Sequence, residues 1–150
     1  MFDNLLLDID GVISDVSHIE KDIDGSVESY DIFYSKIHTA EVIEAGVELY
    51  RSLISKTKNL YYVTSRRERS RKQTEKFLYN NLLFGLDRPH SVNQKLIMRQ
   101  DDDWRDSPST KKEMLERLNL AGISLFVDDL EENCDMARSL GLPVLRVRFI

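Results

Sequence analysis

The sequence predicts an α/β fold: a single Rossmann-like domain of three layers, in which helices cover both faces of a parallel sheet. Short apolar runs that end in polar residues alternate along the chain with stretches of helical periodicity. Such strand–helix–strand alternation favours right-handed crossovers and a parallel sheet. The length of 150 residues fits one compact domain with one core.

Five segments have the character of buried strands. Four are rich in Leu, Val, Ile, Tyr or Phe, as strands covered on both faces tend to be. The segment at 95–98 is shorter and gives a weaker signal. In chain order the predicted strands are residues 4–9, 59–63, 95–98, 124–127 and 144–149.

Four helices are predicted between these strands, at residues 44–55, 67–83, 109–118 and 131–140. The first places Val47, Tyr50 and Ile54 near one side. The third has the start signal Ser-Pro-Ser-Thr. The fourth stops at Gly141, a residue suited to a helix C-terminus.

Composition excludes several classes of protein. Apolar residues make up 41% and charged residues 31%, as in globular domains. The apolar runs are too short to cross a bilayer, and no signal peptide is recognisable, so a cytoplasmic protein is expected. Cys134 is the single cysteine, which excludes an intramolecular disulfide. The net charge of −5 argues against non-specific nucleic-acid binding by the whole surface.

Two carboxylates close the first predicted strand. Asp8 and Asp10 are separated by one residue and point to the same side if the chain stays extended. Gly11 allows a sharp turn directly after them. The alternative is a strand end with two solvated acids, and this motif alone does not decide between the two.

Polar residues also follow the later strands. Thr64 could donate to a phosphate oxygen or cap the next helix, and taken alone the cap is favoured. Asp128 and Asp129 follow a buried strand, where adjacent acids are costly unless they are paired or bind a hard cation. Lys111, near a helix start, could supply a fixed cation. Ligands bind at the carboxyl ends of such strands, so the order of these groups favours a phosphate site.

These residues resemble the motifs of the haloacid dehalogenase superfamily of phosphotransferases, over residues 5–147. The resemblance implies a covalent aspartyl-phosphate mechanism with Mg²⁺ as cofactor. Because Asp10 is an acid able to protonate a leaving oxygen, a phosphatase is favoured over a dehalogenase. The resemblance implies that Asp8 is the nucleophile and Asp10 the general acid/base. It implies phosphate binding for Thr64 and Lys111, with Lys112 a poorer candidate, and a positioning role for Asp128. The implied metal ligands are Asp8, Asp129 and the carbonyl of Asp10.

A narrower resemblance concerns the substrate. Val63-Thr64-Ser65-Arg66 and the basic helix after it are similar to the 3′-phosphatase domain of phage-type polynucleotide kinase-phosphatases. This implies substrate-binding roles for Ser65 and Arg66 and a nucleic-acid 3′ end or a nucleotide as partner. The alternatives are a nucleotidase, a general small-molecule phosphatase, or a non-catalytic module that binds phospho-ligands. The complete set of motif residues argues against the last.

Residues 13–43 form a small cap-like insertion, too short for a domain with its own core, so an open site is expected. The basic run from Arg66 to Lys76 is either a track for a phosphate backbone or a solvated helix face, with the latter slightly favoured. Trp104 is expected in an exposed loop, where base stacking is an unsupported alternative. The sequence leaves the oligomeric state open.

Overall fold

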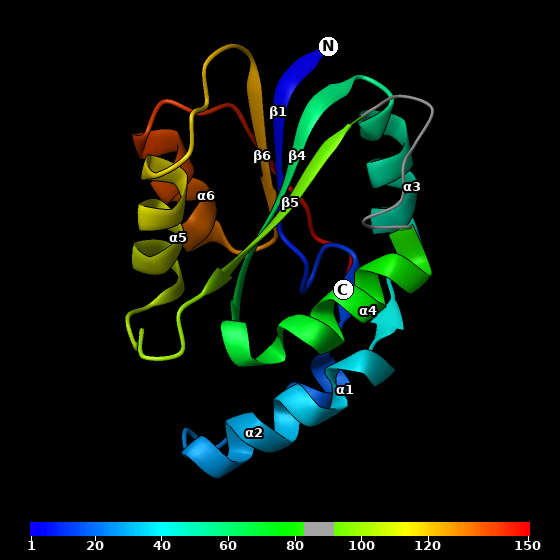
Figure 1. Cartoon of the computed structure of the whole chain (residues 1–150), viewed down its shortest axis with the longest axis vertical. Helices are drawn as coiled ribbons and strands as arrows, with labels where there is room; N and C mark the ends of the chain where they lie inside the picture. Colours follow the sequence, from blue (N-terminus) through cyan, green and yellow to red (C-terminus); the bar gives the residue numbers. More distant parts are fainter. Residues whose placement is uncertain (83–91) are drawn as a thin grey trace.

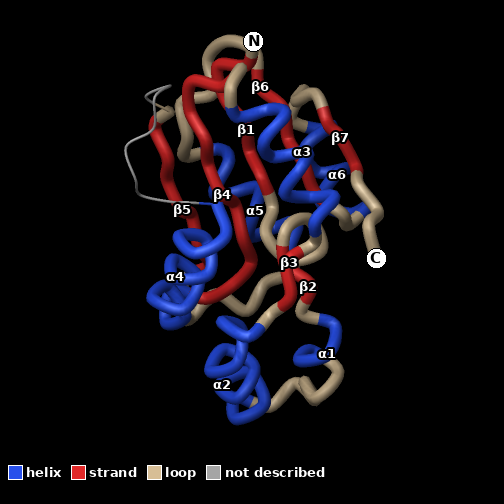
Figure 2. Tube along the Cα trace, turned by 90° about the vertical axis from the view of Figure 1, so that its right-hand side faces the viewer, coloured by secondary structure: helices blue, strands red, loops and turns tan. Residues whose placement is uncertain are grey.

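The computed structural model describes residues 1–82 and 92–150. A five-stranded sheet forms its centre, in the order β5-β4-β1-β6-β7, and every neighbouring pair is parallel (Figure 2). This confirms the predicted α/β fold. The strands are β1 (Phe2–Leu7), β4 (Thr57–Arg67), β5 (Asn93–Arg99), β6 (Ser124–Asp128) and β7 (Val144–Arg146).

Helices cover both faces of this sheet. The helices α3 (Glu44–Ile54) and α4 (Arg71–Leu82) pack on one face, and α5 (Ser107–Glu116) and α6 (Glu131–Ser139) on the other (Figure 1). Asp106 caps α5 by accepting from the N–H of Ser109 at 2.9 Å. In the part of the chain that the structure describes, no helix has both the length and the hydropathy to cross a membrane.

The pleat of β1 explains why the end of this strand is apolar on both faces. Leu5 and Leu7 pack into the cluster under α3 and α4, whereas Leu6 packs into the cluster under α5 and α6. All three side chains are fully buried. Since successive side chains of a strand point to opposite faces, a central parallel strand that is covered on both faces has apolar residues at consecutive positions.

Some predicted boundaries were wrong, for local reasons. The first strand ends at Leu7 rather than residue 9, because the carbonyl of Ile9 accepts from the N–H groups of Val12, Ile13 and Ser14 in a tight loop. β4 continues beyond residue 63 to Arg67 because it still pairs with β5 after a register shift. A short 3₁₀ helix, Glu68–Ser70, therefore precedes α4. The predicted helix end at Leu83 lies outside the described residues.

The insertion at 13–43 lies beyond the carboxyl edge of the sheet, at the bottom of Figure 1. It comprises β2 (Ser14–Asp15), α1 (Ser17–Glu20), α2 (Val27–Lys36), a 3₁₀ helix (Ile37–Thr39) and β3 (Glu41–Val42). β2 and β3 pair antiparallel, so the insertion leaves and re-enters the domain at one place. Against expectation it has a small apolar cluster of its own: Val16, Ile19, Phe33, Tyr34 and Ile37.

Candidate active site

The carboxyl ends of β1, β4 and β6 and the start of α5 bring the sequence-predicted residues together. They line one cavity of about 270 Å³, here called the acidic cavity. Its lining includes six of the predicted site residues: Asp8, Asp10, Thr64, Ser65, Lys111 and Asp129. The other two, Arg66 and Asp128, are buried and hydrogen-bond to members of this set.

Lys111 is the buried cation of the site. Its Nζ donates to Asp8 Oδ1 at 2.8 Å and to Asp128 Oδ2 at 2.7 Å. Burial lowers the pKa of Lys111, but the two carboxylates outweigh burial and raise the pKa above its ordinary value. The ammonium is therefore charged at neutral pH. Lys112, the poorer sequence candidate, is exposed to solvent.

The single positive charge of Lys111 does not balance the negative charge of the carboxylates around it. Oxygens of Asp8, Asp128 and Asp129 lie within 4.8 Å of one another. Burial and the neighbouring Asp128 raise the pKa of Asp8 well above its ordinary value and raise that of Asp129. With all three ionised, one ammonium leaves two negative charges uncompensated. A divalent cation with a preference for oxygen ligands would balance them.

Asn133, in the first turn of α6, adds an acceptor to this cavity. Its Nδ2 donates to both oxygens of Asp128, at 3.2 and 3.1 Å. Its Oδ1 is buried and accepts from no donor among the described residues. An acceptor left without a donor at such a place suits the hydrated shell that Mg²⁺ usually keeps. The donor set therefore fits Mg²⁺. Sequence reasoning missed Asn133, whose signal was its position one helical turn after the acid pair.

The backbone conformation and the packing at position 11 require a glycine. Its φ of +84° is one that side chains rarely adopt. A Cβ at this position would also lie 2.1 Å from Asp129 Oδ2. The absence of a side chain thus lets Asp129 of the β6 end pack directly against the loop that carries Asp8 and Asp10.

The carboxylate of Asp10 is hydrogen-bonded to an arginine. Arg66 donates to both its oxygens, from Nε at 3.0 Å and from Nη2 at 2.5 Å. The remaining hydrogen bonds of the guanidinium are to Ser14 and Thr74. Arg66 is 2% exposed. The resemblance implied that this arginine binds substrate phosphate, whereas its donors are aimed at Asp10 and neighbouring hydroxyls.

The two hydroxyls near the end of β4 have different partners. Thr64 Oγ1 accepts from the N–H of Arg66 at 3.1 Å, which leaves its own proton available to an incoming acceptor. Ser65 Oγ lies 2.7 Å from Ser107 Oγ at the start of α5. Ser107 and Glu20 also line the acidic cavity and were not predicted. Burial, then the nearby Asp10 and Asp15, raise the pKa of Glu20.

The basic run is mostly committed to contacts within the protein. Arg69 pairs with Asp31 of the insertion at 3.3 Å, and its guanidinium lies 5.3 Å from the Tyr34 ring centre. Arg71 pairs with Glu68 at 2.8 Å and with Glu75 at 3.3 Å. Arg69 therefore attaches the insertion to the domain, and Arg71 stabilises the start of α4. These contacts argue against a continuous track for a phosphate backbone.

Comparison with known proteins agrees with this geometry. The model of a family described as the polynucleotide kinase PNKP phosphatase domain matches residues 3–149. No curated protein sequence matches the chain. Among solved structures, a chain of the Pnkp1/Rnl/Hen1 RNA repair complex is 21% identical with a TM-score of 0.73, over 99% of this chain and 43% of that one. The present chain thus spans less than half the length of that protein.

Two bacterial structures share the fold at lower identity. The HAD-hydrolase YfnB from Bacillus subtilis, solved with bound magnesium, is 13% identical with a TM-score of 0.65, over 97% of this chain and 88% of that one. A HAD family enzyme from Bacteroides thetaiotaomicron, solved with magnesium and inorganic phosphate, is 16% identical with a TM-score of 0.55, over 99% and 96%.

Proposed function

Because the chain belongs to the polynucleotide kinase PNKP phosphatase domain family, a group of HAD phosphatases, we propose that it is an Mg²⁺-dependent phosphomonoesterase for nucleic-acid 3′ ends. The observation that carries the proposal is the contact of Lys111 with both Asp8 and Asp128 inside the acidic cavity. A charged, buried lysine beside a buried carboxylate fits an anionic substrate attacked by that carboxylate.

In the first step, an Asp8 oxygen attacks phosphorus and the P–O bond to the alcohol breaks, so the phosphoryl group is carried by Asp8. Asp10 gives its proton to the leaving oxygen. The hydroxyl of Thr64 and the ammonium of Lys111 hold the phosphoryl oxygens and stabilise the charge that develops on them. Asp128 holds Lys111 in place, and Asn133 holds Asp128.

In the second step, Asp10 takes a proton from water, which attacks the phosphorus and restores the Asp8 carboxylate. Arg66 keeps the Asp10 carboxylate turned toward the cavity in both steps. Asp8, Asp129 and the backbone carbonyl of Asp10 would hold Mg²⁺, which supplies charge neutralisation between the carboxylates and the phosphate when bound.

The test begins with turnover of an aryl phosphate in Mg²⁺. A panel then compares a 3′-phosphorylated oligonucleotide, a nucleoside 3′-monophosphate and a sugar phosphate. We expect Mg²⁺-dependent turnover, with the highest kcat/KM for the oligonucleotide. Equal values for the oligonucleotide and the mononucleotide would identify a nucleotidase or general phosphatase instead. No turnover of any ester would identify a non-catalytic binding module.

A further inference from the structure

A second cavity of about 290 Å³ adjoins the acidic cavity and has a different lining. Aromatic rings from α2 and from the loop after β5 form part of it, and arginines form much of the rest. Asp10 and Ser65 line both cavities, so the two are contiguous. The residues of this aromatic cavity that matter here are Tyr30, Tyr34, Trp104, Arg67 and Arg99.

We propose that the aromatic cavity is the subsite for the nucleotide that carries the scissile phosphate, with its base stacked on Trp104 beside Tyr30. This rests on the proposed function, because the mechanism fixes the direction of the leaving group. The leaving oxygen must reach Asp10 to be protonated. With the phosphate beside Asp8 and Lys111, a leaving group beyond Asp10 extends into the aromatic cavity.

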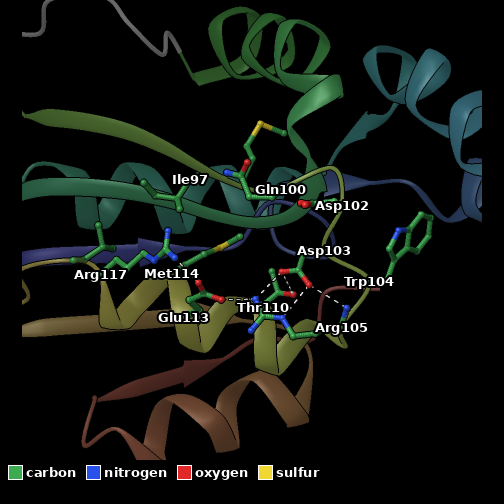
Figure 3. Close-up of a pocket in the computed structure, with 12 residues that line it drawn as sticks. Ile97, Gln100, Asp102, Asp103, Trp104, Arg105, Thr110, Glu113, Met114 and Arg117 are labelled. Carbon is green, nitrogen blue, oxygen red and sulfur yellow. Dashed lines mark hydrogen bonds and ion pairs between the residues drawn. The ribbon is translucent and has the colours of Figure 1, made fainter.

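Trp104 has the exposure and the support of a stacking platform. It is 57% exposed, and its ring meets Tyr30 edge-on with centroids 6.1 Å apart. The Arg67 guanidinium lies 3.9 Å from the ring centre and backs it. Figure 3 shows the ring projecting from its loop, away from Thr110 and Glu113 on α5. Single-stranded nucleic acids commonly bind through such rings, since every base has a π-face.

The loop that carries Trp104 is fixed from within. Arg67 Nη1 donates to the carbonyls of Asp101 and Asp103 at 3.0 and 2.7 Å. Arg99 Nη1 donates to the carbonyls of Asp103 and Arg105 at 3.1 and 2.7 Å. The ring is thus held before any ligand arrives, which lowers the entropic cost of binding. A larger cavity of about 560 Å³, which Trp104 also lines, lies between β5 and α5, and Asp8 is not among its lining residues.

The two buried arginines also favour an anion. Arg67 is 4% and Arg99 7% exposed, and their short contacts are to carbonyl oxygens. The nearest carboxylate to Arg99 is that of Asp103, at 3.9 Å. Arg67 Nε is buried without an acceptor among the described residues. A nucleotide has both of the groups that this cavity suits: a flat base, which can stack on the exposed ring, and a backbone phosphate, which can contact the arginines.

Trp104 is the single tryptophan of the chain, so any change in tryptophan fluorescence on binding arises at this residue. The experiment titrates the Asp8→Asn protein, which binds without turnover, with a 3′-phosphorylated oligonucleotide in Mg²⁺. We expect quenching by this ligand and none by inorganic phosphate. An oligonucleotide with an abasic terminal sugar should bind about tenfold more weakly, the effect of losing one base stack. Equal affinity for the abasic ligand, or no change in emission on binding, would overturn the proposal.

Kinetics give a second test that separates the subsite from the reaction. In Trp104→Ala, the ratio of kcat/KM for the oligonucleotide to that for an aryl phosphate should fall about tenfold. Tyr79→Ala, which removes an exposed ring on α4, is the matched control and should leave the ratio unchanged. An unchanged ratio in Trp104→Ala overturns the subsite alone, whereas an inactive wild-type protein overturns the proposed function.

Discussion

Arg66 holds Asp10 through two nitrogens, at 3.0 and 2.5 Å, although the two residues are 56 positions apart in the chain. The arginine stands on β4 just after Thr64, and the carboxylate stands on the loop after β1. The pair therefore fixes Asp10, the proposed general acid, relative to the hydroxyl that would hold the phosphate. A guanidinium is suited to this because its planar fork matches a carboxylate.

Arg66→Lys should impair catalysis through the orientation of Asp10. Lysine keeps the charge but cannot contact both oxygens in one plane. We expect kcat to fall by about 10²-fold for an alkyl phosphate, as when general acid–base assistance is lost. A nitrophenyl phosphate, whose leaving group needs little protonation, should be affected less. Arg51→Lys, at an exposed pair with Glu48, is the control. An equal loss on both substrates would argue for a phosphate-binding role.

Lys111→Ala should destabilise the protein and remove activity, whereas Lys112→Ala should do neither. Lys111 is 1% exposed between Asp8 and Asp128, so its loss leaves buried carboxylates without their partner. Breaking such a buried network costs about 3–5 kcal/mol. Urea unfolding in chelator measures the change in the free energy of unfolding. Comparable stability of the two variants would contradict this account of the cluster.

Asp8→Asn should abolish turnover without loss of folding. Asparagine is nearly isosteric but is a poor nucleophile, so kcat should fall at least about 10³-fold. In the metal-free protein the pKa of Asp8 is raised by burial and by Asp128, so the ionised group opposes folding at neutral pH. The Tm in chelator should therefore be no lower than that of the wild type. A markedly lower Tm, or substantial residual turnover, would count against the assignment.

Mg²⁺ should raise the Tm of the wild-type protein, and chelation should stop turnover. Binding to the folded state alone stabilises by mass action, by about 2.7 kcal/mol at a hundredfold excess over Kd. Asp129→Asn should lose most of this response because it removes one of the three clustered carboxylates. Asp135→Asn, on the exposed side of α6, is the matched control. Full activity in excess chelator would refute the metal assignment.

Alkaline pH should destabilise the protein partly through Cys134. Burial, and then Asp128, raise the pKa of its thiol from 9.0 to about 11. Below pH 9 the thiol is protonated in both states and contributes no pH dependence. Above it the unfolded state ionises first, so stability falls as pH rises toward 11. The wild type should therefore lose stability more steeply in this range than Cys134→Ala. Parallel curves in urea unfolding would contradict the prediction.

The sequence predicted the parts of this molecule that depend on local pattern. Runs such as Leu5–Leu7 mark buried strands because both faces are covered, and the carboxyl ends of parallel strands meet at one edge. Asp8, Thr64 and Asp129 could thus be assigned to one site from their positions after strands. Lys111 needed the family resemblance as well, since a lysine near a helix start is common.

What the sequence did not predict arises from contacts between distant segments. Nothing near Arg66 indicates that its partner is Asp10, because the pairing depends on how far β4 extends beyond Val63. The aromatic cavity joins α2 to the loop after β5, and this requires the insertion to fold back against the core. Arg69 fixes that packing through Asp31, which a charge pattern alone cannot reveal.

The paired strands β2 and β3 join the insertion to the domain through a narrow stem, with Ser14 opposite Val42 and Asp15 opposite Glu41. On the domain side the stem is anchored by close packing, since a Cβ at Gly46 of α3 would lie 1.6 Å from the carbonyl oxygen of Val12. The chain beyond the stem reaches the site through side chains that line the two cavities, Glu20 in the acidic cavity and Tyr30 in the aromatic cavity. Substitutions in this module would therefore change the walls of both cavities without replacing the residues of the loop that carries Asp8 and Asp10.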